Sequence, residues 1–260
     1  MKRLNKFKHR VRKFGLLGAL KLTLHKVGTG LRKKTILGLE RPEDRFTKIY
    51  HSNHWNNFES RSGEGSTLEN TENIRVELPR ILELYKISKM LDAPCGDFNW
   101  MQYVTAKTSI KYIGGDIVKP LIADNRSKYS DKDTTFIHLD LTKSPLPEAD
   151  LLFCRDCLIH LSYKDISLVL KNFLNSSIPY LITTSSAAPS GPRIKNSNIT
   201  TGDMRPIDLF AEPFGLRQRD ALESISEGRV SLQAEWSLVL LKRVTVQTML
   251  KTITSHIEGT

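Results

Sequence analysis

The sequence predicts an α/β fold organised around a mostly parallel sheet. Short apolar runs alternate along the chain with segments whose apolar residues recur at helical spacing. Such alternation is typical of parallel strands joined by crossover helices. The last two runs follow one another without a helical segment between them, which indicates a terminal antiparallel pair. Together these patterns predict a Rossmann-like sheet with right-handed crossovers.

The expected strands and helices follow in chain order. Strands are predicted at 87–91, 111–118, 134–141, 149–156 and 179–184, with the final pair at 218–226 and 236–244. Helices are predicted from Thr67 to about Tyr85, from Trp100, at 120–129, at 162–174 and after Gln247. Ser66 and Glu69 would form a capping box for the first helix, and Pro79 would break it. The long polar segment 185–205 suggests a binding loop.

The stretch after the first expected strand reads Asp92-Ala-Pro-Cys-Gly-Asp-Phe-Asn-Trp100. A strand, tight turn and helix would point free N–H groups at a ligand above the strand end. A dinucleotide pyrophosphate needs three glycines there, whereas only Gly96 is present, Pro94 lacks an N–H and Asp97 adds a negative charge. The ammonium and sulfonium of S-adenosylmethionine (SAM) suit this charge better. The alternative is that Asp97 only caps the helix.

This stretch resembles the first motif of class I SAM-dependent methyltransferases, in a bacterial-type variant that reads D-A-P-C-G-D-F-N-W. The similarity extends from about Tyr50 to about Lys242, and Pro94 and Phe98 stand where glycines are usual. It implies the seven-stranded methyltransferase fold, with SAM as the cofactor. We therefore expect a cofactor site made of Asp92, Pro94, Cys95, Gly96, Asp97, Phe98, Trp100, Asp116, Ile117, Asp140, Leu141 and Arg155.

Two of these acids stand at the ends of expected strands. Asp116 lies 20 residues after Gly96, an offset at which an acid can accept both ribose hydroxyls. A surface acid that closes a turn is the alternative. Asp140 corresponds in the resemblance to an acid beside the adenine amino group, although hydrophobic neighbours can also serve that position.

Candidate catalytic residues follow the fourth expected strand. The residues from Asp156 read Asp-Cys-Leu-Ile, not the Asn-Pro-Pro-Tyr type of nucleic-acid and protein N-methyltransferases, which favours O-methylation of a small molecule. His160 is the best candidate base, because its ordinary pKa lies near neutrality. Asp156 is predicted to act with it, and a structural role for His160 is the alternative. The cysteines nearby make only a weak metal pattern, so we expect no metal.

Three residues are predicted to bind the acceptor: Arg205, Trp55 and Ser60. Arg205 would clamp a carboxylate or phosphate, or else anchor its loop through a salt bridge. Its neighbourhood, 198–209, resembles a second distinctive segment of the family. The resemblance also implies that the small polar loop 59–66 is a lid over the cofactor, the alternative being a plain connection.

The positive charge is concentrated at the N-terminus. The net charge is +11, but residues 1–34 hold twelve of the 39 Lys and Arg and no acid, which leaves 27 basic and 28 acidic residues elsewhere. We therefore expect no nucleic-acid-binding face on the main domain. Apolar residues of the N-terminal segment share one side of a helical projection, which predicts docking on an anionic membrane or a partner. The alternatives are a solubilising tail and, less favoured, an organellar targeting peptide.

Four regions are expected: a basic extension (1–39), a helical lid or cap segment (40–88), a SAM-binding domain (89–246) and a tail (247–260). Three cysteines indicate reduced thiols, hence a cytoplasmic protein, peripheral at the inner membrane surface if the extension binds lipid. The predicted function is methyl transfer from SAM to a small-molecule, glycan or lipid-linked acceptor. The alternatives are a nicotinamide-dependent oxidoreductase and a non-catalytic scaffold with a partner-binding tail.

Overall fold

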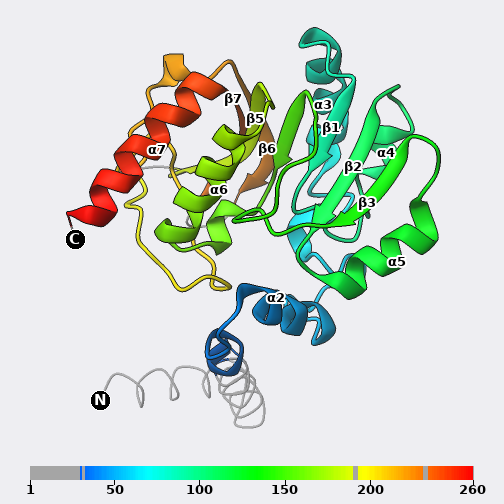
Figure 1. The fold of residues 1–260 in the computed structure, drawn as a ribbon, viewed down its shortest axis with the longest axis horizontal. Coiled ribbons are helices and arrows are strands. Elements are labelled where there is room, and N and C mark those ends of the chain that lie inside the picture. Colours follow the sequence, from blue (N-terminus) through cyan, green and yellow to red (C-terminus); the bar gives the residue numbers. More distant parts are fainter. Residues whose placement is uncertain (1–29, 31–32, 190–192, 231–233, 260) are drawn as a thin grey trace, which may run out of the picture.

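The computed structural model describes residues 30, 33–189, 193–230 and 234–259. A seven-stranded sheet of order β3-β2-β1-β4-β5-β7-β6 runs through the molecule (Figure 1). Only β7 runs antiparallel to its neighbours. This confirms the predicted Rossmann-like sheet and its terminal pair. The strands are β1 (Lys89–Asp92), β2 (Lys111–Asp116), β3 (Thr134–His138), β4 (Leu151–Cys154), β5 (Tyr180–Ala187), β6 (Glu223–Val230) and β7 (Glu235–Lys242).

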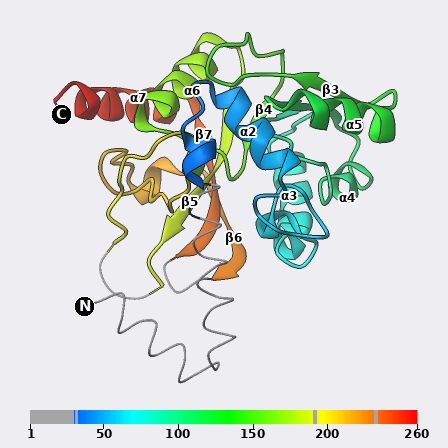
Figure 2. The same cartoon turned by 90° about the horizontal axis from the view of Figure 1, so that it is seen from below.

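Helices cover both faces of the sheet. The helix α3 lies with α4 and α5 on one face, α6 and α7 lie on the other, and α2 crosses below the sheet edge (Figures 1 and 2). The helices are α2 (Pro42–His51), α3 (Glu72–Leu84), α4 (Gln102–Thr105), α5 (Lys119–Tyr129), α6 (Tyr163–Asn175) and α7 (Arg243–Glu258), with 3-10 turns η1 (Glu64–Ser66), η2 (Leu158–His160) and η3 (Gln218–Asp220).

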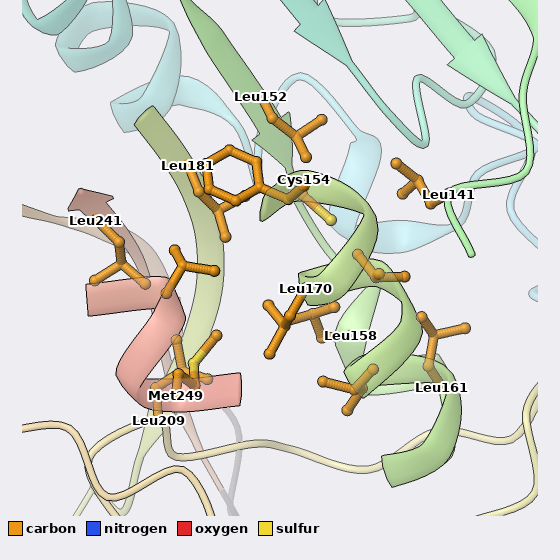
Figure 3. Packing of buried hydrophobic residues seen from close by; sticks show 14 of the residues in the cluster. Leu141, Leu152, Cys154, Leu158, Leu161, Leu170, Leu181, Leu209, Leu241 and Met249 are labelled. Carbon is orange, nitrogen blue, oxygen red and sulfur yellow. The ribbon is translucent and has the colours of Figure 1, made fainter. Parts of the chain in front are cut away.

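Alternation along the strands divides the core into two clusters. Leu151 and Phe153 pack with α3, α4 and α5, whereas Leu152 packs with α6 and α7. Figure 3 shows Leu152 of β4 above Leu170 of α6, with Met249 of α7 lower on the left. Each such side chain contributes about 1.5–3 kcal/mol when fully buried. The sheet is therefore held from both sides, and its carboxyl edge is left for a site.

The first predicted helix, α3, differs from the prediction in where it begins and in being unbroken at Pro79. It begins at Glu72, Ser66 lies in η1, and no side chain caps its N-terminus, so the predicted capping box is wrong. The helix also continues through Pro79 without ending. Four buried side chains hold it on the sheet and offset the hydrogen bond that proline removes: Ile74, Leu78, Ile81 and Leu82.

The last helix is longer than predicted. α7 begins at Arg243, directly after β7, and its Val246, Met249 and Ile253 are buried. The Arg243 guanidinium donates to four carbonyls at the end of α6: Phe173, Leu174, Ser176 and Ile178. Met249 and Ile253, which follow Gln247, thus pack in the core.

The N-terminal amphipathic segment expected within residues 1–34 lies almost entirely outside the described residues. Lys33 does fall inside them, and its Nζ lies 2.5 Å from Asp203 Oδ1. Within the described parts of the chain, no helix combines the length and apolar character needed to cross a membrane.

Candidate functional site

A cavity of about 400 Å³ opens at the carboxyl ends of β1, β2 and β4. Ligands of open α/β sheets bind at this edge. Thirteen of the predicted site residues line it: Trp55, Asp92, Pro94, Cys95, Gly96, Trp100, Asp116, Ile117, Asp140, Leu141, Arg155, Asp156 and His160. Four predicted site residues do not: Ser60, Asp97, Phe98 and Arg205. The sheet therefore brings most of the predicted set together.

The turn after β1 uses its backbone N–H groups within the protein. The donors are Ala93 N to Phe153 O (2.9 Å), Cys95 N to Gly115 O (2.9 Å), Gly96 N to Asp116 Oδ2 (3.2 Å) and Asp97 N to Ser62 Oγ (3.0 Å). Pro94 has no N–H, and α4 begins only at Gln102 and has four residues. The turn from Ala93 to Asp97 therefore has no free N–H to offer an anion.

Asp116 ends β2 with its carboxylate at the cavity wall. Val118 N donates to its Oδ1 (2.9 Å) and Gly96 N to its Oδ2 (3.2 Å), and the residue is 7% exposed. Burial raises the pKa of this carboxyl to about 6, against the lowering effect of the backbone donors. Each oxygen keeps a further lone pair for a ligand hydroxyl.

Asp92 is the last residue of β1 and is more deeply buried than Asp116. The Tyr112 hydroxyl donates to Asp92 Oδ2 at 2.7 Å. Burial raises the pKa of the Asp92 carboxyl to about 8. At neutral pH this residue is mostly protonated, so it offers the cavity a neutral carboxylic acid.

Asp140 lies beyond the end of β3, in a turn. Its Oδ1 accepts from the backbone N (2.9 Å) and hydroxyl (2.6 Å) of Thr142, and its Oδ2 lies 3.3 Å from Lys143 Nζ. These contacts close the turn and place Leu141 on the cavity wall.

The polar loop 59–66, named here the lid, contributes Arg61 to Ser66 to the cavity wall and is fastened at both ends. At one end Asp97 accepts from Ser60 Oγ (3.0 Å), Arg61 N (2.6 Å) and Ser62 Oγ (3.2 Å). At the other end Arg155 Nη2 donates to Gly65 O (2.7 Å). The predicted contacts of Asp97 with the cofactor and of Ser60 with the acceptor are therefore wrong, because these two side chains fasten the lid to the turn.

Gly96 is required where the lid meets the turn. Its φ is +55°, a left-handed conformation that favours glycine. A Cβ added there would also overlap Ser62 Oγ.

Phe98 is a core residue, so its predicted cofactor contact is also wrong. Its ring packs against those of Tyr112, Tyr129 and Phe136 at centroid distances of 5.0, 5.2 and 5.2 Å.

His160, in η2, faces the cavity as a neutral ring. Its Nδ1 lies 2.8 Å from the Asp203 carbonyl oxygen. A carbonyl only accepts, so Nδ1 carries the proton and Nε2 holds the lone pair. Burial lowers the pKa of His160, and the Asp156 charge partly opposes this. The Trp55 ring lies beside it, with centroids 5.6 Å apart.

Asp156 is held as an anion next to this histidine. Arg229 Nη2 donates to Asp156 Oδ1 (2.9 Å), and Arg155 Nη1 lies 3.5 Å from Oδ2. Burial opposes ionisation, but the two arginines lower the pKa of Asp156 to about 2.

Arg205 does not clamp an anion, which corrects that prediction. Its guanidinium donates to four carbonyls: Ser197 (2.8 Å), Leu158 (3.0 Å), Ile159 (2.9 Å) and Leu161 (2.8 Å). It is 6% exposed, and burial lowers its pKa to about 10. It therefore anchors the loop 197–205 to η2 through carbonyls, not through the salt bridge considered as the alternative.

Three residues of the terminal strand pair belong to the site but were not predicted. Arg229 and Trp236 line the cavity, and Glu227 contacts both arginines that hold Asp156. The signal was the recurrence of Ile225, Glu227 and Arg229 on one side of β6, because a residue two positions from a buried isoleucine faces the same way.

Among the described residues, no group of three or more His, Cys, Asp and Glu side chains is arranged to hold a metal ion. Cys95 and Cys154 are buried, and Cys157 is partly buried.

No family model matches the chain, and no curated protein matches its sequence. Solved structures do match its fold. PigF with S-adenosylhomocysteine (SAH) is 12% identical, with a TM-score of 0.56 over 88% of this chain and 74% of that chain. A Burkholderia thailandensis 1,6-didemethyltoxoflavin-N1-methyltransferase with bound 1,6-didemethyltoxoflavin and SAH is 15% identical, with a TM-score of 0.53 over 78% and 91%.

A human N-acetylserotonin methyltransferase in complex with SAM is 15% identical, with a TM-score of 0.49, and this chain covers 58% of that chain. The two likenesses above a TM-score of 0.5 cover 78% and 88% of this chain, and so include most of its seven-stranded sheet. The chain therefore has the seven-stranded, Rossmann-like fold of the class I methyltransferases.

Proposed function

We propose that the protein is a SAM-dependent methyltransferase that methylates an oxygen of a small-molecule acceptor. The observation that carries this proposal is a single cavity that unites Asp116, at the end of β2, with His160 and Asp156 after β4. The first is an acid suited to ribose hydroxyls, and the other two are a base and its charged neighbour. The SAH bound in structures of similar fold supports the same cofactor.

In this proposal the cofactor lies between the lid and the strand ends. Asp116 accepts the ribose hydroxyls through the lone pairs that its backbone donors leave open. Ile117 and Leu141 supply apolar wall for the adenine ring. Trp100 and the turn from Asp92 to Gly96 line the rest of the cofactor's path.

The turn after β1 disfavours the nicotinamide alternative. A pyrophosphate is bound by backbone N–H groups, yet those from Ala93 to Asp97 are already donated or, at Pro94, missing. Asp116 would add a negative charge nearby whenever it is ionised. Asp97 no longer contributes to this argument, because its carboxylate is bonded to the lid.

The proposed chemistry is a direct displacement at the methyl carbon. The acceptor oxygen forms a bond to the methyl group, the carbon–sulfur bond breaks, and the sulfonium leaves as the neutral thioether of SAH. His160 Nε2 takes the hydroxyl proton, and anionic Asp156 stabilises the resulting imidazolium. Positioning supplies most of the remaining acceleration.

The acceptor class includes glycans and lipid-linked molecules as well as free small molecules. A lipid-linked acceptor would fit a protein whose segment 1–34 holds twelve basic residues and no acid. The protein would then work in the cytoplasm, at an anionic membrane surface.

The test is transfer of label from methyl-tritiated SAM into separate small-molecule, glycan and lipid extracts. The proposal predicts a labelled product in at least one extract, with its methyl group on oxygen. His160→Ala should lower turnover by roughly a hundredfold, and His51→Ala, an exposed histidine outside the cavity, should not. SAH binding without transfer into any extract would instead support the non-catalytic scaffold.

A further inference from the structure

The pairing of β6 with β7 is irregular at one point beside the cavity. Ser226 pairs with Ser237 and Val230 pairs with Glu235, so the three residues from Glu227 to Arg229 stand opposite Trp236 alone. Gly228, at the centre, has a φ of +70°. Bulges of this kind re-aim side chains next to functional sites. Here Glu227 is buried although it belongs to a terminal strand of the sheet.

Glu227 holds two arginines that act on different parts of the site. Its Oε1 and Oε2 accept from Arg155 Nε (3.3 Å) and Nη2 (2.8 Å). Its Oε2 is also ion-paired with Arg229. The Glu227 side chain has no exposed surface, so neither contact is screened by water.

Each of the two arginines also contacts a second part of the site, the lid or Asp156. The same Nη2 of Arg155 that meets Glu227 donates to Gly65 O of the lid. Arg229 Nη2 donates to Asp156 Oδ1, and a Cβ at Gly65 would overlap the Arg229 guanidinium. Only a glycine at position 65 therefore lets the lid pack here, directly against the charged cluster of Arg155, Asp156, Glu227 and Arg229.

We propose that Glu227 is a positioning residue that couples closure of the lid to the orientation of Asp156. The inference rests on the proposed function, since it concerns how the lid covers SAM and how Asp156 is presented to His160. Without the Glu227 charge, Asp156 is the one remaining acid of the cluster and draws both arginines toward itself. Arg155 then leaves Gly65 O, and the lid loses its hydrogen bond to the arginine at that end.

Hydrogen exchange on the ligand-free protein tests the coupling without any assumption about the cofactor. The lid amides of Gly63 and Ser66 donate within the lid, to Ser60 O and Gly63 O, and report its order. Glu227→Gln should raise exchange of these amides about tenfold or more, the size of one hydrogen bond to a charged group. Exchange in α6 should stay as in the wild type. Glu223→Gln is the matched control, because Glu223 lies on the same strand and pairs with Arg80.

Arg155→Lys is a second route that does not depend on the stability of Glu227→Gln. Lysine keeps the positive charge beside Glu227 but lacks the planar fork that reaches two partners at once. It should loosen the lid as Glu227→Gln does, and the double variant should exchange no faster than the faster single variant. Equal protection in the wild type and both variants, or additive effects of the two changes, would overturn the coupling.

A second measurement tests whether the coupling through Glu227 also controls the rate at which SAH is released. Stopped-flow release of SAH, followed by tryptophan fluorescence, should be about tenfold faster in Glu227→Gln with the association rate unchanged. A wild type that binds no SAH but shows the exchange pattern would refute the proposed function and leave the coupling standing. A wild type that binds SAH, with release unchanged in Glu227→Gln, would refute the coupling alone.

Discussion

The carboxylate of Asp97 accepts the backbone N–H of Arg61 at 2.6 Å, across 36 positions of sequence. The same carboxylate accepts the hydroxyls of Ser60 and Ser62. The turn after β1 thus binds one end of the lid through a single side chain, Asp97.

Asp97→Asn should therefore loosen the lid. The amide oxygen can still accept a hydrogen bond, but the charge that strengthens the contacts is lost. We expect the Kd of SAH to rise about tenfold, mainly through faster dissociation. Stopped-flow release measures this, with the exposed Asp133→Asn as the control. A slower association with unchanged dissociation would show that Asp97 does not act through the lid.

Gly96→Ala should disturb the lid by steric contact. The new Cβ carries the cost of a positive φ, about 1–2 kcal/mol, and also overlaps Ser62 Oγ. Gly215→Ala is the matched control, since its φ is +64° and a Cβ there meets nothing within 4 Å. The free energy of unfolding in urea should fall further for Gly96→Ala than for Gly215→Ala. Equal losses of unfolding free energy in the two variants would mean that the lid accommodates the added Cβ with no loss of stability.

The raised pKa of Asp92 should make the free energy of unfolding fall as pH rises. Its pKa in the folded protein, about 8, lies above the ordinary value of 3.8. The folded state therefore binds this proton more tightly, and the stabilisation is complete below about pH 4 and lost as pH rises through 8.

Asp92→Asn should accordingly remove a decline in the free energy of unfolding between about pH 4 and pH 8. Urea titrations at intervals of pH, for both proteins, measure the difference in slope. Parallel curves would show that burial does not raise the pKa of Asp92.

The N-terminal segment is predicted to determine location and not chemistry. A variant that lacks residues 1–29 keeps the ion pair between Lys33 and Asp203, and with it the support of the loop that bonds His160. It should no longer sediment with anionic vesicles but should bind SAH as before. Retained sedimentation would place the membrane contact elsewhere, and weakened SAH binding would give the segment a role in the site.

The sequence predicted the sheet well because its central parallel strands are buried at nearly every position, so they stand out as short apolar runs between segments of helical spacing. It located Asp116 and His160 for the same reason, since Asp116 ends β2, His160 follows β4, and both strands end at the same edge of the sheet. It misassigned Asp97 and Arg205 because charge indicates the need for a partner but does not identify it. Their partners, Ser60 and the carbonyls of η2, are distant in the chain. It missed Glu227 because the expected strand ended at Ser226, whereas β6 continues to Val230.

Calorimetric titration with SAH, and separately with NAD and NADP, tests the central claim most directly. We predict that SAH binds and that neither dinucleotide binds comparably, because the turn after β1 has no N–H from Ala93 to Asp97 left for a pyrophosphate. Asp116→Ala should weaken SAH by about 1.5–3 kcal/mol, the scale of hydrogen bonds to a charged group. Binding of NAD in place of SAH, or SAH affinity unchanged in Asp116→Ala, would contradict the account.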